Sequence, residues 1–166
     1  FLAWDRENDI VYLTAEYKAG EVDISVHAGR LKMRLQAMKQ VSMPGVGDYS
    51  GSDVSTGAKI LDLYKAQGLR IQPANKVGRD TGIQNIYERM ETGRFKVFKT
   101  CTMFLQELRT YAYDEKTLQI IKKDDHLLDA VRYAVTSGLA LAEPPRQEKY
   151  RQKTEEMTLG IHTYHR

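Results

Sequence analysis

The chain opens with two short apolar runs that are rich in aromatic and β-branched residues. The first, FLAW, covers residues 1–4, and the second, IVYLTAEYK, covers residues 10–18. The link between them, DREND, is polar throughout. Two such runs joined by a short polar link are typical of a β-hairpin. The pattern therefore predicts two paired strands at the start of the chain.

Beyond the hairpin, segments with helical spacing of apolar residues alternate with short strand-like runs. Helices are predicted over residues 21–40, 56–68, 78–93, 101–115 and a late segment that ends near 142. Short strands are predicted within residues 42–51, 69–74 and 94–100. A hairpin followed by alternating strands and helices predicts an α/β fold, with helices packed on the faces of a mixed β-sheet. In such sheets functional residues gather at the carboxyl ends of the strands.

Composition and charge narrow the class of protein without deciding its function. The chain has 166 residues, of which 42% are hydrophobic and 28% charged, as in ordinary globular domains. We expect one domain over residues 1–142 and a polar tail over residues 143–166, because Pro144 and Pro145 end the last helix. No apolar stretch approaches the roughly 18 residues of a membrane span. The lone Cys101 excludes an internal disulfide and indicates a reducing compartment, and a net charge of +3 is compatible with a polyanionic partner.

The stretch KKDDHLLDAVRYAV, residues 122–135, carries the strongest candidate chemistry. At about 100° per residue, one face is apolar and would pack on the sheet: Leu127, Leu128, Val131, Ala134 and Val135. The opposite face is polar: Asp125, His126, Asp129, Arg132 and Tyr133. Carboxylates favour helix N-termini by about 0.3–1 kcal/mol, which explains Asp124 and Asp125 as a capping pair. Asp129 lies more than one turn inside the helix, so a metal site is the alternative interpretation.

A second candidate is PGVGDYSGSD, residues 44–53. Its glycines suggest a phosphate loop, but the closing Lys-Ser/Thr is absent and the glycine spacing does not match a dinucleotide-binding loop. We interpret the stretch as a strand that ends at Asp48. Gly45 and Gly47 would then allow another backbone, or a nucleic-acid strand, to approach closely. The alternative is that Asp48 simply starts a turn.

Taken together, three stretches resemble one family. KKDDHLLDAVRYAV, GDYSG and GRFKVFKTCTMFLQELRTYAYDE (residues 93–115) are similar to the C-terminal nuclease domain of tailed-phage terminase large subunits. The resemblance runs from the hairpin to about Ala142, and D-H-x-x-D-A-x-R-Y is its most specific part. It implies an RNase H-like mixed β-sheet flanked by helices. The family's first carboxylate lies on a strand before the hairpin, and we find no match for it, so we expect that first strand to be absent from this chain.

The resemblance also implies a chemistry. In the family, acidic residues on strands and on the late helix hold two divalent ions, Mg²⁺ or Mn²⁺, that cut DNA. By position, Asp48 is the strand carboxylate and Asp129 the helix carboxylate. His126 is a further ligand or a proton-handling neighbour, and Asp125 is a weaker candidate beside the ions. Without the first-strand carboxylate, we expect this chain to cut poorly.

The implied function is a metal-dependent endonuclease that cleaves concatemeric double-stranded viral DNA in the cytoplasm of the infected bacterium. The family implies further partners: the portal protein, the small terminase subunit and an ATPase domain of the same polypeptide. Basic residues would hold the DNA backbone: Lys76, Arg79, Arg94, Lys96, Lys122 and Lys123. Two alternatives stay open. One is a non-catalytic module that docks on DNA or the portal, and the other is an RNase H-like resolvase or transposase core.

Two further residues receive structural interpretations. Glu107 is predicted to lie on a helix surface, or to pair with Arg109 or with a neighbouring strand. Cys101 is predicted to be a small buried apolar residue at the start of a helix.

Overall fold

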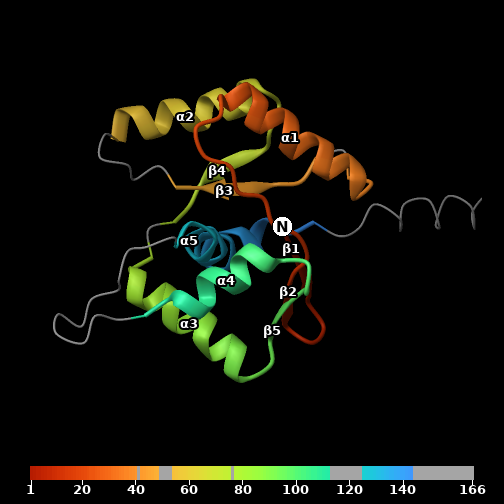
Figure 1. The fold of residues 1–166 in the computed structure, drawn as a ribbon, viewed down its shortest axis with the longest axis vertical. Helices are drawn as coiled ribbons and strands as arrows, with labels where there is room; N and C mark the ends of the chain where they lie inside the picture. Colours follow the sequence, from red (N-terminus) through yellow and green to blue (C-terminus); the bar gives the residue numbers. More distant parts are fainter. Residues whose placement is uncertain (41, 49–53, 76, 113–124, 144–166) are drawn as a thin grey trace, which may run out of the picture.

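Short strands alternate with helices along the chain (Figure 1). The computed structural model describes residues 1–40, 42–48, 54–75, 77–112 and 125–143. Its strands are β1 (Leu2–Asp5), β2 (Ile10–Leu13), β3 (Gly45–Gly47), β4 (Ile71–Pro73) and β5 (Phe95–Val97). Its helices are α1 (Ile24–Ala37), α2 (Val54–Ala66), α3 (Arg79–Glu91), α4 (Thr102–Thr110) and α5 (His126–Tyr133). Helix α5 continues into a π-helical turn, η1 (Ala134–Gly138), and a 3-10 turn, η2 (Leu139–Leu141).

The predicted hairpin is confirmed and forms the edge of a three-stranded sheet. β1 and β2 are antiparallel, with Leu2 opposite Leu13. β5 pairs with β2 in parallel, with Val11 opposite Phe95, which gives the order β1-β2-β5. Alternate residues of a strand point to the same face of the sheet. Val11 and Leu13 are accordingly both buried and belong to the main core.

A second, smaller sheet consists of β3 and β4. The two strands are parallel, with Gly45 opposite Ile71 and Gly47 opposite Pro73. Helices α1 and α2 pack on each other and lie beyond this pair, on the side away from α5 (Figure 1). The mixed α/β class is therefore confirmed. Within the described ranges the strands are divided between two sheets, a division that the alternation of strands and helices along the sequence does not reveal.

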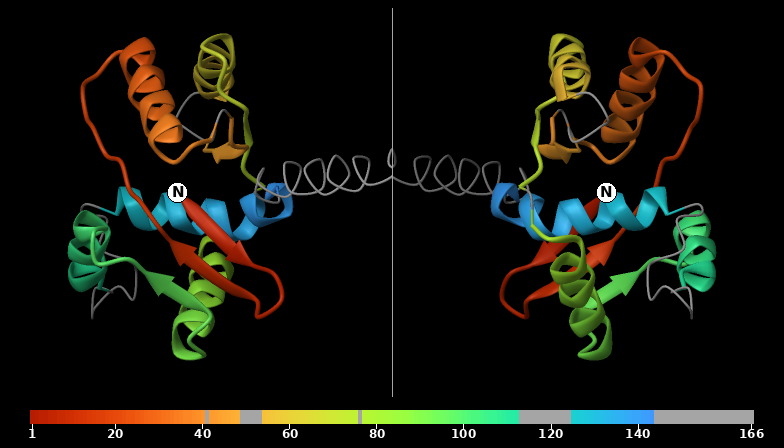
Figure 2. Two further views of the ribbon diagram at one scale, coloured as in Figure 1. Left: turned by 90° about the vertical axis from the view of Figure 1, so that its right-hand side faces the viewer. Right: turned by 90° about the vertical axis from the view of Figure 1, so that its left-hand side faces the viewer.

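Helix α5 lies between the two sheets (Figure 2). On its apolar face, Leu127, Val131 and Val135 are buried, as the helical spacing predicts. They pack in the core cluster with Val11, Leu13, Phe95, Cys101 and Phe104. The cluster confirms the buried position of Cys101, and burial raises the pKa of its thiol. Because α5 also contacts β3, it links the main core to the smaller sheet.

The boundaries of some helices differ from those that the sequence pattern predicted. Helix α4 ends at Thr110, whereas the sequence pattern predicted a helix to residue 115. Residues 113–115 of that predicted helix lie outside the described ranges. Gly68 and Gly93 follow α2 and α3 with φ of 79° and 69°, the left-handed conformation that glycine adopts readily after a helix. Residues 144–166, most of the predicted tail, also lie outside the described ranges. Among the described helices, none has the length and apolar character to cross a bilayer.

Candidate metal and nuclease site

Three of the predicted site residues lie at the start of α5. Asp125 immediately precedes the helix, and His126 is its first residue and exposed. Asp129 lies one turn later, with its side chain 34% exposed. Residues three positions apart on a helix lie on the same side. His126 and Asp129 thus lie on the same side of the first turn, with the apolar face of the helix turned into the core.

Arg132 corrects one prediction for this helix. The helical spacing placed it on the polar face, yet its side chain is only 8% exposed. Its Nε and Nη2 donate to Oδ1 of Asp129 at 3.1 and 2.9 Å, and its guanidinium stacks on the ring of Tyr133 at 4.3 Å from the centroid. Burial acts to lower the pKa of Arg132, but the bonds to Asp129 and the contact with Tyr133 outweigh it and raise that pKa. Arg132 therefore forms an ion pair that holds the carboxylate of Asp129 in place.

Gly82 of α3 makes room for this arginine. A Cβ atom at position 82 would lie 2.8 Å from Cγ and 2.9 Å from Cδ of Arg132. These distances are shorter than packed carbon atoms tolerate. The helical spacing could not identify Arg132 as buried, because the residue that admits it lies on another helix.

Asp125 is held by a different arginine. Its Oδ2 accepts a hydrogen bond of 2.7 Å from Nη2 of Arg79, at the start of α3. Asp125 occupies the N-cap position of α5, but its side chain makes no capping bond. The predicted capping role of Asp125 is therefore wrong, and Asp124 lies outside the described residues. Asp125 and Arg79 instead tie the start of α5 to the start of α3.

Asp48 follows β3 directly and is exposed. The strand before it is tightly packed: a Cβ on Gly47 would lie 2.7 Å from Cδ2 of Leu61. This confirms that β3 runs up to Asp48. The close approach at Gly47 is made by a side chain of α2, however, and not by a backbone or nucleic-acid strand as predicted. The association of the carboxylates of Asp48 and Asp129 stays a prediction.

The elements that carry the two aspartates nevertheless pack together. β3 contacts both α5 and η1. A Cβ on Gly138 of η1 would lie 3.6 Å from Cγ2 of Val46, and the amide of Asn75 donates to Oγ of Ser137 at 2.9 Å. The smaller sheet therefore rests against the α5–η1 segment.

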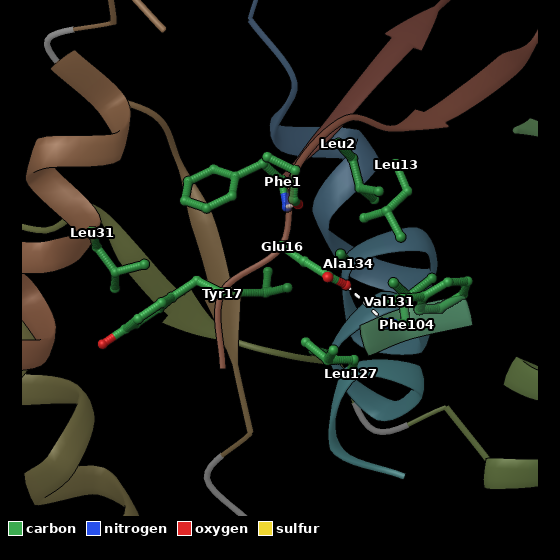
Figure 3. Close-up of a pocket in the computed structure, with 13 residues that line it drawn as sticks. Phe1, Leu2, Leu13, Glu16, Tyr17, Leu31, Phe104, Leu127, Val131 and Ala134 are labelled. Atoms are coloured by element: carbon green, nitrogen blue, oxygen red, sulfur yellow. Dashed lines mark hydrogen bonds between the residues drawn. The ribbon is translucent and has the colours of Figure 1, made fainter. Parts of the chain in front are cut away.

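A pocket of about 280 Å³ lies between the hairpin, β3 and the α5–η1 segment (Figure 3). Its walls include Phe1 and Leu2 of the hairpin, Leu31 of α1, Val46 of β3 and Ala134 of η1. Most of the lining is apolar. The carboxylate of Glu16 points toward α4, where it accepts a hydrogen bond from the amide of Phe104 (Figure 3). The pocket shows that the strand before Asp48 and the helix that carries Asp129 border the same space.

Glu107 corrects a second prediction. It does not lie on a helix surface: its side chain is 5% exposed and pairs with Lys18 at 2.8 Å. It also accepts the backbone amides of Leu127 and Leu128 at the start of α5. The predicted pairing with a neighbouring strand is close to this outcome, because Lys18 follows β2. No local pattern in the sequence identifies a glutamate that serves the next helix.

Comparison with known proteins shows the family to which this chain belongs. Residues 1–137 match the family model described as the terminase RNaseH-like domain. The chain belongs to this family. The resemblance proposed from the three sequence stretches is thereby confirmed.

Curated relatives and solved structures agree with the terminase assignment. The terminase large subunits of Enterobacteria phage LP7 and Salmonella phage P22 are each 31% identical over 138 residues, or 80% of this chain. The match covers 28% and 27% of those proteins, so the chain spans little more than a quarter of their length. The nuclease domain of the P22 large terminase is similar with a TM-score of 0.66 and 30% identity, over 81% of this chain and 71% of that one. The nuclease domain of the phage SPP1 large terminase, solved with bound Mn, has a TM-score of 0.58 at 20% identity over 80% of this chain and 73% of its own, and supports the fold. The RNase H-like class is confirmed.

The donor set of this terminase domain suits a divalent ion, although the described residues make only part of a site. Mg²⁺ and Mn²⁺ both prefer carboxylate oxygens as ligands. A histidine among the ligands favours Mn²⁺ over Mg²⁺. Both bonds from Arg132 end on Oδ1 of Asp129, so Arg132 itself does not engage Oδ2. Within the described ranges, no three His, Cys, Asp or Glu side chains are grouped so that they could hold a metal ion. Asp48, Asp129, His126 and Asp125 therefore stay predicted ligands.

The predicted DNA-binding residues differ in their surroundings. Arg79 bonds Asp125, and Arg94 donates to Oδ2 of Asp9 at 3.0 Å. Lys96 is exposed on β5. The other three candidates lie outside the described residues: Lys76, Lys122 and Lys123. Since Arg79 and Arg94 already neutralise aspartates, they offer less net charge to a phosphate than the count of basic residues implies.

Proposed function

We propose that this chain is the metal-dependent endonuclease domain of a phage DNA-packaging terminase large subunit. It would cleave concatemeric double-stranded viral DNA by two-metal-ion hydrolysis of phosphodiester bonds. The observation that carries the proposal is the first turn of α5. There His126 and Asp129 lie on one side, and the buried Arg132 holds Asp129, in a chain of the terminase RNaseH-like family.

The residues would divide the work as follows. Asp48 from a strand end and Asp129 from a helix would hold Mg²⁺ or Mn²⁺ from two directions. His126 would complete the ligand shell or accept a proton, and Asp125, held by Arg79, would act from outside that shell. When bound, a pair of ions would activate the attacking water and stabilise charge on the leaving oxygen. Arg132 would keep one carboxylate oxygen of Asp129 occupied and the other directed outward.

DNA would be held through its phosphates. Lys96 would contribute directly, and Arg79 and Arg94 would contribute only the charge that their aspartate partners leave. Contacts of this kind make affinity fall as salt rises and carry little sequence information. The three basic residues outside the described ranges remain candidates for the same surface.

The wider setting of the proposal comes from the relatives, which are terminase large subunits. A packaging terminase would bring this domain together with an ATPase domain of the same polypeptide, a small terminase subunit and the portal protein. Its place would be the cytoplasm of the infected bacterium. Family membership also favours the terminase function over the resolvase or transposase alternative.

Nicking of supercoiled plasmid tests the proposal. We expect slow nicking that requires Mn²⁺ or Mg²⁺ and stops with EDTA. Asp48→Asn and Asp129→Asn should each lower the rate by more than the roughly 10–100-fold that loss of an outer-shell partner costs. Asn at 129 keeps an oxygen that can accept from Arg132, so we expect the fold to be preserved. The matched control is Asp62→Asn, an exposed aspartate of α2 paired with Lys65, which should keep the wild-type rate.

A double variant decides the matter. If Asp48→Asn combined with Asp129→Asn still nicks plasmid at the wild-type rate, the activity comes from another protein and the nuclease proposal is wrong.

A second function has one observation in its favour. Because no three ligands are grouped within the described ranges, a module that docks on DNA or the portal without cutting would also fit. Isothermal titration with Mn²⁺ separates the two functions. Heat above the buffer control that disappears in Asp129→Asn supports the nuclease, whereas no heat together with retained DNA binding supports docking.

A further inference from the structure

Both oxygens of the buried Glu107 are engaged inside the protein. Oε1 accepts from the ammonium of Lys18 at 2.8 Å. Oε2 accepts from the amides of Leu127 and Leu128 at 2.7 and 3.2 Å. A buried carboxylate is tolerated only when charged partners and hydrogen bonds replace its water. Glu107 has such partners on both oxygens. Its side chain therefore stabilises contacts within the protein and is not positioned as a metal ligand.

The two amides that Glu107 holds belong to the turn that carries the proposed site. The first amides of a helix have no partner within the helix and need one from outside. Asp125, at the N-cap position, gives its carboxylate to Arg79 and makes no capping bond. Glu107 of α4 takes over this role for the residues between His126 and Asp129. The rotation and position of this turn are therefore set by α4.

The segment after β2 fixes α4 by the same kind of contact. The two carboxylate oxygens of Glu16 accept the amides of Met103 and Phe104, both at 2.8 Å, at the start of α4. Lys18, two residues further on, holds Glu107. We call Glu16, Lys18 and Glu107 the capping relay. It joins the end of β2 to the start of α4 and then to the start of α5.

We propose that Glu107, oriented by Lys18, is a positioning residue that sets the metal affinity of the α5 turn. It does so by holding the backbone between His126 and Asp129, without touching metal or DNA. The inference rests on the proposed function, because it concerns how the predicted ligands His126 and Asp129 are presented. Glu16 is one step removed, since it caps α4 and makes no contact with α5 among its described bonds.

The test measures Mn²⁺ affinity and local amide exchange in the same variants. Glu107→Gln keeps the size of the side chain but removes its charge. We expect it to weaken Mn²⁺ binding by about 10–100-fold, as loss of an outer-shell partner does. The amides of Leu127 and Leu128 should exchange faster, and saturating Mn²⁺ should restore most of the nicking rate. Lys18→Met, which leaves the two amide bonds in place, should shift both quantities in the same direction by a smaller factor.

Two controls separate positioning from a general loss of stability. Glu7→Gln changes an exposed glutamate of the hairpin link and should alter neither quantity. Glu16→Gln removes the same kind of charge from the start of α4. We expect it to lower the melting temperature while changing Mn²⁺ affinity far less than Glu107→Gln does. If Glu16→Gln and Glu107→Gln weaken Mn²⁺ binding equally at equal loss of stability, the positioning role is wrong.

The outcomes also separate this inference from the proposed function. If the wild-type protein binds Mn²⁺ and Glu107→Gln binds it with unchanged affinity, the inference fails and the nuclease proposal stands. If the wild-type protein binds no Mn²⁺ and nicks no plasmid, the proposed function fails and takes this inference with it. Amide exchange at Leu127 and Leu128 would then still report whether Glu107 caps α5.

Discussion

The described part of the molecule has two packing units that differ in how many apolar side chains they bury. The large unit consists of β1, β2 and β5 with α3, α4 and α5, and it holds the whole main core, in which Val11, Cys101 and Phe104 are fully enclosed. The small unit consists of β3 and β4 with α1 and α2. Its described buried apolar residues are fewer, Ala28, Leu35, Leu61 and Ala74, and large apolar side chains such as Met33 lie exposed on its helices.

The difference bears directly on the proposed site, because the units carry different halves of it. Asp129 and His126 belong to the large unit, where Arg132 and Glu107 fix their turn. Asp48 belongs to the small unit, at the end of a three-residue strand. The alignment of the two halves depends on the joint between β3–β4 and the α5–η1 segment. In the proposed site, buried contacts would hold the half that carries His126 and Asp129, whereas the position of Asp48 would depend on the joint.

The largest expected effect comes from the core of the large unit. Phe104→Ala should lower the free energy of unfolding by about 3–5 kcal/mol, because it removes a fully buried ring. Leu35→Ala in the small unit should cost about 2–3 kcal/mol, at the low end for a buried leucine, because fewer buried apolar residues belong to that unit. Chemical denaturation measures the free energy of unfolding of both variants. Hydrogen exchange in the native state then shows which strands each variant affects. The contrast between the units would be refuted if Leu35→Ala accelerated exchange in β2 and β5 as much as Phe104→Ala does.

An intermediate effect is expected where α3 meets the site. Gly82→Ala would bring a methyl group against Cγ and Cδ of Arg132 and should cost roughly 1–3 kcal/mol through overpacking. Because Arg132 must move, its bonds to Asp129 should weaken, and Mn²⁺ affinity should fall with stability. The matched control is Gly29→Ala on α1, where no heavy atom lies within 4 Å of the new Cβ. That variant should gain up to about 1 kcal/mol from helix propensity. Equal losses in the two variants would mean that Gly82 is not a packing requirement.

The smallest effect should arise at the joint itself. Ser137→Ala removes the hydroxyl that accepts from the amide of Asn75. Because this contact is exposed and water can replace it, the expected cost is about 0.5 kcal/mol, the low end for a hydrogen bond. Hydrogen exchange should nevertheless rise in β4 and stay unchanged in β2. Thr92→Ala, which removes an exposed hydroxyl bonded to Glu88 within the large unit, provides the comparison. If both variants leave β4 unchanged, the joint does not depend on this bond.

The sequence by itself determined the local elements and the identity of the family. Alternating apolar runs located the hairpin, and helical spacing located α1, α2, α3 and the buried face of α5, because these patterns depend on neighbours a few residues away. The motif D-H-x-x-D-A-x-R-Y identified the family and placed His126 and Asp129 on one side of a helix. Arg132 was placed on the wrong face, since the helical wheel contains no information about Gly82.

Only the tertiary structure decided which partners these residues have. Glu107 caps a helix that begins 19 positions after it in the sequence and pairs with Lys18 across 89 positions, and no periodic pattern spans such distances. The division of the strands into two sheets, and with it the separation of Asp48 from Asp129 into different units, has the same origin. Contacts between distant segments depend on how whole elements pack, whereas the period of apolar residues reports only which side of each element faces inward.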